Sequence, residues 1–290
     1  MQELRRVRDG VRGKGFKGAV GTAASYYELV GATSFEVFEG KLSTLLDLPF
    51  FEVASQTYPR RHDYTVISAL AGMGSSLHKF AFDLRLMQSP VIGEWNEPFA
   101  EKQVGSSAMP FKRNPINAEK IDSLARLLAG MPQVAWQNAA QSLLERTLDD
   151  SANRRSILPE SFLICDELLR VSLRIIKGIQ INQSAIQRNL DIYAPFAATE
   201  RLLMALVKAG ADRQVMHEYL REHAIRAWQA VQEGQPNPLS AQIVSDPHFT
   251  QYFTANQIQS MMQVEGYTGI AAERSIAITN SIQNLLSEHQ

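Results

Sequence analysis

The sequence has 290 residues, 45% hydrophobic and 20% charged, so it is long enough to bury a large core in one or two domains. A formal net charge of −1 argues against a general nucleic-acid binder, and no run of about 18 apolar residues could span a bilayer. The single cysteine, Cys165, excludes an internal disulfide and predicts a buried thiol. Since the first residues also lack the apolar segment of a signal peptide, we expect a cytoplasmic protein.

A glycine-rich loop lies near the start of the chain. Residues 13–18 read Gly-Lys-Gly-Phe-Lys-Gly, which is formally the G-x-G-x-x-G spacing of dinucleotide-binding loops. That motif needs a hydrophobic strand before it and a βαβ unit around it, whereas here an arginine-rich helical segment precedes it. We therefore expect a tight bend at this loop and no dinucleotide.

Three long helices are predicted, because apolar residues recur mostly at alternating spacings of four and three positions. Such spacing keeps one narrow seam of each helix facing a partner helix, so three seams predict an all-α bundle. The seams are Val66, Leu70, Met73, Leu77, Phe80, Leu84 and Met87, then Ile121, Leu124, Leu128, Met131 and Ala135, and finally Ile157, Ile164, Leu168, Val171 and Ile175.

The third helix carries further apolar residues beside its seam. One chain is not expected to cover all of this surface, which favours self-association. A monomeric bundle with internal pairing is the alternative. The residues concerned are Phe162, Leu163, Leu169 and Ile176.

The stretch between the first two seams is the most informative about function. Residues 105–115 read Gly-Ser-Ser-Ala-Met-Pro-Phe-Lys-Arg-Asn-Pro, and a glutamate follows at position 119. Small residues let a ligand approach the loop closely, and Asn114 followed by proline is a typical capped helix start. Because Lys112 and Arg113 stand just before that start, the segment favours a ligand with carboxylates or phosphates. On these residues alone, an ordinary Gly-Ser turn before a capped helix is the alternative.

A second polar stretch follows the second seam. Residues 144–155 read Leu-Glu-Arg-Thr-Leu-Asp-Asp-Ser-Ala-Asn-Arg-Arg. Its guanidinium groups and hydroxyl, from Arg146, Ser151, Arg154 and Arg155, suit a two-pronged grip on phosphate or carboxylate. The alternative is a solvated helix start in which the two aspartates of the stretch balance the arginines.

The pattern changes near Gly178. Beyond it, shorter helices alternate with stop signals, including Gly210 and Gly234. Asp212 predicts a helix cap, and a final helix is expected from about Ala271.

We therefore expect residues 1–181 to form a central helical bundle domain and residues 182–290 a smaller C-terminal helical domain. The histidines of the second domain lack the spacing and carboxylate neighbours of a metal site, so we expect surface or core residues. The residues concerned are His217, His223 and His248, three of the four histidines in this range.

Together the two polar stretches resemble the fumarase/aspartase superfamily. The first contains Gly-Ser-Ser-x-Met-Pro-x-Lys-x-Asn followed by Glu, with every fixed position filled. The second resembles the Glu-Arg and Ser-x-x-x-Arg segment of the adenylosuccinate lyase branch, which Ala108 and the run 112–115 also fit. The resemblance covers essentially the whole chain. It implies an all-α, long-helix bundle of the fumarase/aspartase type with a smaller C-terminal helical domain.

The resemblance also implies a reaction, the elimination of fumarate from adenylosuccinate to give AMP and from succinylaminoimidazole carboxamide ribotide, both in purine biosynthesis. Ser106 would remove the proton next to the succinyl carboxylate, and Lys112 would stabilise the charge that develops. Ser107 is the alternative base. Lys120 stands where close members carry arginine, so it would hold substrate as a point charge. The implied substrate contacts are Gln56, Ser107, Met109, Asn114, Lys120, Arg146, Ser151 and Arg155.

The resemblance further implies no cofactor, no metal, a small-molecule substrate and a homotetramer, without nucleic-acid or membrane partners. The tripeptide Arg61-His62-Asp63 imitates a motif of the family's N-terminal domain. It stands at the expected start of a bundle helix, so we expect His62 to be structural.

The match begins partway through the family pattern, at residues 4–9. The preceding family part supplies an Arg-Tyr phosphate contact, a histidine-bearing segment and a Thr-x-His-x-Gln string whose histidine is the general acid. Family members build each active site from three subunits of a tetramer, so this chain alone is expected to be inactive. The alternatives are another superfamily lyase, with a succinyl or carboxymuconate-type substrate, or a truncated, non-catalytic helical assembly protein.

Overall fold

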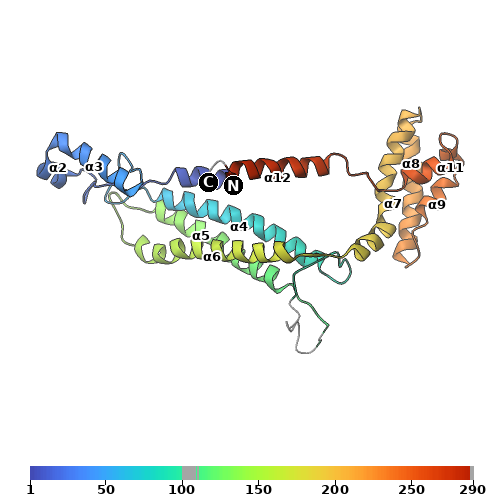
Figure 1. Ribbon diagram of the computed structural model, residues 1–290, viewed down its shortest axis with the longest axis horizontal. Coiled ribbons are helices and arrows are strands. Elements are labelled where there is room, and N and C mark those ends of the chain that lie inside the picture. The colour runs from blue at the N-terminus through green and yellow to red at the C-terminus, as the bar shows by residue number, and fades with distance from the viewer. Residues whose placement is uncertain (100–108, 110, 288–290) are drawn as a thin grey trace. The chain divides into compact units, whose positions relative to one another are not determined.

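The computed structural model describes residues 1–99, 109 and 111–287, and it divides into two compact units, Met1–Ile181 and Asn182–Gln290. Helices dominate both units, which confirms the all-α prediction (Figure 1). The described elements of the first unit are α1 (Gln2–Asp9), α2 (Ala24–Val30), α3 (Ala32–Leu46), α4 (Arg61–Met87), β1 (Trp95–Asn96), α5 (Ile116–Ala140), α6 (Asp150–Gly178) and β2 (Gln180–Ile181).

The first unit is built around α4, α5 and α6, which lie side by side (Figure 1). The second and third predicted seams are confirmed: Ile121, Leu128 and Leu168 are fully buried, and Leu124 packs against the same core. Cys165 is also buried there, and burial raises the pKa of its thiol to about 11. A short antiparallel pair, β1 with β2, lies beside the ends of α4 and α6.

The first predicted seam is confirmed only in part: Leu84 is fully buried, and Leu70 and Leu77 pack against the core. The most deeply buried positions of α4 include Ile67, Gly74 and Ala81, whereas Met73 and Phe80 are only partly buried at the side of the core. Small residues face the core because α4 packs against two helices at once. A Cβ added at Gly74 would lie 2.9 Å from the Leu128 side chain and 3.6 Å from that of Leu168, so a larger residue would push the helices apart.

The flanking apolar residues of α6 remain open to solvent in the single chain. The exposed fraction is 53% for Phe162, 68% for Leu163, 50% for Leu169 and 58% for Ile176. A contiguous apolar surface of this kind is typical of a protein–protein contact. Within the described residues, no helix is long and apolar enough to cross a membrane.

The glycine-rich loop packs against the segment that leads into α4. The backbone of Gly13 donates to Pro49 and accepts from Phe51. Gly21 adopts φ +84°, and a Cβ there would lie 2.1 Å from the carbonyl oxygen of Ala54. Only glycine fits such a contact. The bend at Gly21 therefore packs directly against Ala54, in the segment that leads into α4.

The second unit has its own core. Its described elements are α7 (Gln183–Lys208), α8 (Arg213–Gln232), α9 (Leu239–Val244), α10 (Pro247–Thr250), α11 (Ala255–Met261) and α12 (Ala271–Ser287). The predicted cap is confirmed, since Asp212 accepts from the backbone N–H groups of Gln214 and Val215, and Gly210 adopts the left-handed conformation after α7. Fully buried Leu206 and Phe249 belong to the core.

Two histidines of this unit share one carboxylate. The ring of buried His223 lies 2.6 Å from Asp246, which also bonds the ring and the backbone N–H of His248, both at 2.8 Å. Burial alone would raise the pKa of Asp246, but these hydrogen bonds outweigh it and hold the pKa below its usual value. Among the described residues, no group of side chains has the arrangement of a metal site.

A folded-state pKa below the unfolded value means that Asp246 stabilises the fold above about pH 3.9 and that this contribution disappears as the pH falls through the lower, folded value. We expect Asp246→Asn to lower the free energy of unfolding by about 1.5–3 kcal/mol at pH 7, since it weakens charged hydrogen bonds. Urea unfolding of the intact chain at pH 7 and pH 3.5 measures this, with Asp191→Asn as the exposed control. An equal loss of unfolding free energy at both pH values would contradict a stabilising contribution from the lowered pKa of Asp246.

Candidate active site

The structure separates the candidate residues into two groups. Ser106 and Ser107 lie outside the described residues. The α6-start group surrounds the first turn of α6 and consists of Gln56, Arg146, Ser151 and Arg155. The α5-start group surrounds the first turn of α5 and consists of Met109, Lys112, Asn114 and Lys120.

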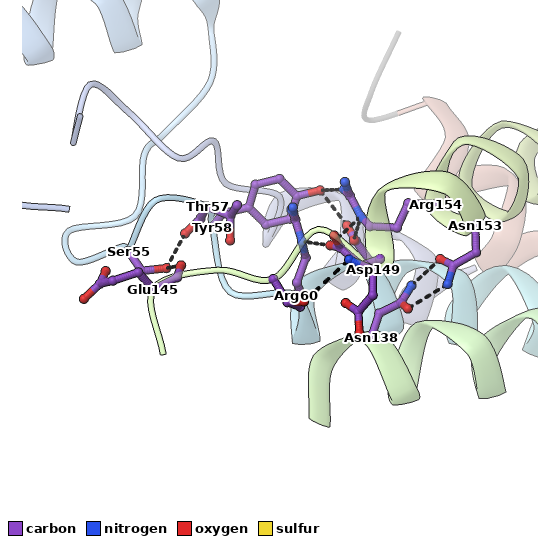
Figure 2. A network of polar contacts seen from close by, with 12 residues as sticks. Ser55, Thr57, Tyr58, Arg60, Asn138, Glu145, Asp149, Asn153 and Arg154 are labelled. Atoms are coloured by element: carbon purple, nitrogen blue, oxygen red, sulfur yellow. Dashed lines mark hydrogen bonds and ion pairs between the residues drawn. The ribbon is translucent and has the colours of Figure 1, made fainter. Parts of the chain in front are cut away.

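The α6-start group is assembled by two segments that are far apart in sequence. The Ser55 hydroxyl donates to the carbonyl of Glu145 at 2.8 Å, so Gln56 and Arg146 follow residues that are in direct contact (Figure 2). The Nε atom of Arg146 is buried and has no hydrogen-bond partner among the described residues. A buried guanidinium N–H without a partner is costly, and an anion is the ligand that would satisfy it.

The other members of this group differ in exposure. Arg155 is exposed on the second turn of α6, and Ser151 is half-buried with its backbone N–H bonded to the carbonyl of Leu148. Both stand near the helix N-terminus, where the helix dipole favours negative charge. The group therefore offers two guanidinium groups, a hydroxyl and an amide to an anionic ligand.

Arg154 belongs to the same sequence motif but has a different role. Its Nη2 donates to the Tyr58 hydroxyl at 2.6 Å (Figure 2). Its Nε lies 2.7 Å from a carboxylate oxygen of Asp63. Burial would lower the pKa of this guanidinium, yet the bond to Asp63 and its charge raise the pKa overall. Of the motif's arginines, Arg154 is thus held by the protein itself.

The α5-start group is arranged by a tight turn. The backbone N–H of Lys112 donates to the carbonyl of Met109 at 2.9 Å, and the Lys112 side chain is exposed. The carbonyl of neighbouring Arg113 accepts from Gln88 at the end of α4, at 3.1 Å. This bond ties the segment before α5 to the end of α4, while Lys112 can still reach a ligand.

The predicted cap of α5 is wrong. The helix begins at Ile116 after Pro115, and no side chain at the cap position bonds its first amides. Glu97 takes that role: its carboxylate accepts from the backbone N–H of Asn117 at 3.1 Å and of Ala118 at 2.5 Å. Glu97 is 5% exposed and comes from the segment after β1. A local sequence pattern cannot predict that this segment lies beside the start of α5. The helix N-terminus therefore already holds an anion.

Lys120 is not free at the surface. Its ammonium forms an ion pair with Glu167 of α6, and the hydrogen bond from Lys120 lowers the pKa of that carboxylate. A ligand at Lys120 would therefore have to share or displace the pairing. Ion pairs this exposed contribute little to stability, so displacement is inexpensive.

The two groups lie at opposite ends of the bundle. The α5-start group surrounds the first residue of α5, while Arg146 follows its last residue, Ala140. With 25 residues, α5 is about 37 Å long at 1.5 Å per residue. The start of α4 lies at the same end as Arg146, since Arg60 pairs with Asp150 at 2.5 Å. One copy of the chain cannot bring both groups to one small ligand.

His62 has surroundings consistent with the structural role expected for it. Its ring packs edge-on against Phe51 and Tyr58, and its Nε2 lies 3.4 Å from the backbone nitrogen of Arg12. Burial is the main reason that its pKa lies below the usual value. The neutral ring therefore joins the loop after α1 to the start of α4.

Comparison with known families places these groups in context. Residues 195–275 match the family model described as adenylosuccinate lyase C-terminus, and residues 1–130 match the model described as lyase. Adenylosuccinate lyase of Schizosaccharomyces pombe is 37% identical over 281 residues, and that of Schistosoma mansoni is 38% identical over 257. The chain belongs to the adenylosuccinate lyase family.

The chain spans little more than half of the length of these family members. The alignments cover 95% of this chain and 57% of the yeast protein, and 86% of this chain and 53% of the schistosome protein. Among solved structures, 3-carboxy-cis,cis-muconate lactonizing enzyme from Pseudomonas putida matches with a TM-score of 0.77 and 26% identity, covering 93% of this chain and 57% of that one. This match shows the fumarase/aspartase-type bundle predicted from the sequence.

Proposed function

We propose that the chain forms part of an adenylosuccinate lyase, which eliminates fumarate from adenylosuccinate to give AMP and from succinylaminoimidazole carboxamide ribotide in purine biosynthesis. The observation that carries this proposal is Arg146, whose buried Nε has no partner in the described part of the chain and whose loop is held against the Gln56 segment. Such a guanidinium is suited to a phosphate or a carboxylate, and the relatives named adenylosuccinate lyase favour the phosphate of a nucleotide.

The chemistry proposed for the loop is proton removal from carbon. Ser106 takes the proton next to the succinyl carboxylate, with Ser107 as the alternative base. The electron pair of that C–H bond forms the double bond of fumarate, the C–N bond breaks, and the departing nitrogen receives a proton from a general acid. Lys112 stabilises the negative charge that develops on the carboxylate, and the same charge favours the ionised serine.

The separation of the two groups supports a shared site. Because about 37 Å of α5 lies between them, a ligand that needs both must meet the α5 start of one copy and the α6 start of another. The uncovered face of α6, including Phe162 and Leu163, offers a surface for that association. We therefore propose a homotetramer in the cytoplasm, acting on small molecules and without nucleic-acid or membrane partners.

The proposed phosphate contacts of Arg146 and Arg155 can be tested by measuring ligand binding. We expect Arg146→Ala and Arg155→Ala each to weaken AMP binding by about 1.5–3 kcal/mol, the range for hydrogen bonds to charged groups, and to leave adenosine binding unchanged. Isothermal titration with both ligands measures this. Arg170→Ala is the matched control, since Arg170 is an exposed arginine of α6 that pairs with Asp166.

The comparison between the two ligands decides the role of these arginines. A loss limited to AMP supports a phosphate contact. Equal losses for AMP and adenosine would show that the arginines act on the fold and not on the phosphate. Tighter binding of a phosphate-free dicarboxylate than of AMP would favour the muconate-type alternative.

A further inference from the structure

A buried polar network lies directly behind the α6-start group. The Tyr58 hydroxyl accepts from Arg154 at 2.6 Å (Figure 2). It also donates to Asp63 at 2.6 Å, and Arg154 pairs with the same carboxylate. Asp63 is 4% exposed. Burial, followed by the hydrogen bond to Asp63, raises the pKa of Tyr58, so the hydroxyl keeps its proton and remains a donor.

A second ion pair extends this network, although Oδ1 of its carboxylate, Asp150, has no hydrogen-bond partner among the described residues. Arg60 and Asp150, both buried, lie 2.5 Å apart, and the Arg60 guanidinium stands over the Tyr58 ring at 5.1 Å from its centroid. Arg154 lies 3.9 Å from the same Asp150 oxygen. The guanidinium and carboxylate charges balance, which is the condition under which buried charges are tolerated. Removing one member leaves a buried partner unpaired.

The network joins the two segments that carry candidate ligand contacts. Tyr58 and Arg60 belong to the segment before α4, whereas Asp150 and Arg154 open α6. Gln56 lies between this network and the Ser55–Glu145 hydrogen bond. Arg146 lies between the same two anchor points on the other segment. Gln56 and Arg146 are therefore each flanked in sequence, before and after, by residues that bond the two segments to each other.

We propose that Tyr58, Asp63 and Arg154 are positioning residues that hold Gln56 and Arg146 in register for one anionic ligand. This inference rests on the proposed function, because it takes Gln56 and Arg146 as ligand contacts. Arg154 supports the ligand contacts and is not proposed as one of them. Its Nε and Nη2 are already bonded to Asp63 and Tyr58, and its side chain is 18% exposed. The adjacent Arg155 is exposed and faces no such constraint.

Tyr58→Phe is the sharpest test, because it removes both hydroxyl bonds and keeps the ring. We expect AMP affinity to fall by about 10-fold, with a smaller change for adenosine, since the phosphate contact at Arg146 loses its register. Tyr64→Phe is the matched control: Tyr64 is a half-buried tyrosine of α4 that packs against the bundle core, and we expect less than a twofold change.

Hydrogen exchange without ligand provides the second measurement. In Tyr58→Phe we expect faster amide exchange in residues 54–58 and 143–149, and unchanged exchange in the middle of α5. Arg154→Lys, which keeps the charge but loses the two-pronged geometry, should show the same pattern. Unchanged exchange in both segments would overturn the proposal, as would faster exchange with an unaltered ratio of AMP to adenosine affinity.

These two measurements separate this inference from the proposed function. If the unmodified chain bound neither AMP nor adenosine, the proposed function would fail, and the positioning of Gln56 and Arg146 for that ligand would fail with it. If the unmodified chain bound AMP and Tyr58→Phe bound it equally well, only the positioning role would fail.

Discussion

Ser106→Ala is expected to lower kcat by about 10²–10⁴ in an active assembly that contains this chain, while KM changes little. The substitution removes the proposed proton acceptor and almost no volume, and removal of a positioned general base has an effect of that size. A steady-state assay of fumarate release measures it. AMP binding should be unchanged, because the phosphate contacts proposed here lie in the α6-start group.

Ser107→Ala is the matched control for this substitution. It removes a neighbouring hydroxyl of the same loop, and we expect a much smaller loss of kcat. The opposite ranking, with Ser107→Ala nearly inactive and Ser106→Ala active, would move the base to Ser107. Equal, small effects of both substitutions would contradict a serine base in this loop.

The second large effect that we expect is recovery of fumarate release when this chain is mixed with an inactivated full-length family member. The 290-residue chain alone should release little fumarate, because its two groups of candidate residues lie at opposite ends of one bundle and the Thr-x-His-x-Gln string is not among its residues. Co-refolding it with a full-length family member whose serine loop is inactivated should restore measurable turnover. Hybrid assemblies can then combine an intact serine loop from this chain with the general acid from the other.

The controls for mixing are each protein alone and a mixture that contains the Ser106→Ala form of this chain, which should not be rescued. Native mass spectrometry verifies that hybrids form. Robust turnover by the 290-residue chain alone would show that another of its residues supplies the acid. Absence of rescue despite verified hybrids would contradict the shared site.

Much of the fold could be predicted because its signals are local. The alternating spacing of Ile121, Leu128 and Ile164 specifies helices and their buried faces without knowledge of any partner. The seam predicted on α4 packs against the core and includes fully buried Leu84, but it leaves out Ile67 and Gly74, which are also buried. Hydrophobic pattern finds large side chains, whereas close packing of α4 against two helices selects small ones.

The candidate site was less predictable, since sequence motifs do not show which charges the fold itself neutralises. The arginines of residues 144–155 look alike in sequence, yet Arg154 pairs with Asp63, while Nε of Arg146 has no partner among the residues that the structure describes. The α5 start looked open to an anion, yet the carboxylate of Glu97 bonds its first amides. Both partners come from distant segments.

The sequence by itself determined the helical class, the family and the residue types of the two motifs, because periodicity and short motifs are written in neighbouring residues. Only the tertiary structure decided how those motifs are placed. Lys112 precedes α5 and Arg146 follows it, so a helix about 37 Å long separates them, and α4 and α6 run in the same direction with their starts together. The same packing brings Tyr58 beside Arg154, across 96 positions of sequence. The distances between these residues depend on how the helices pack in three dimensions, and a local sequence pattern contains no information about that packing.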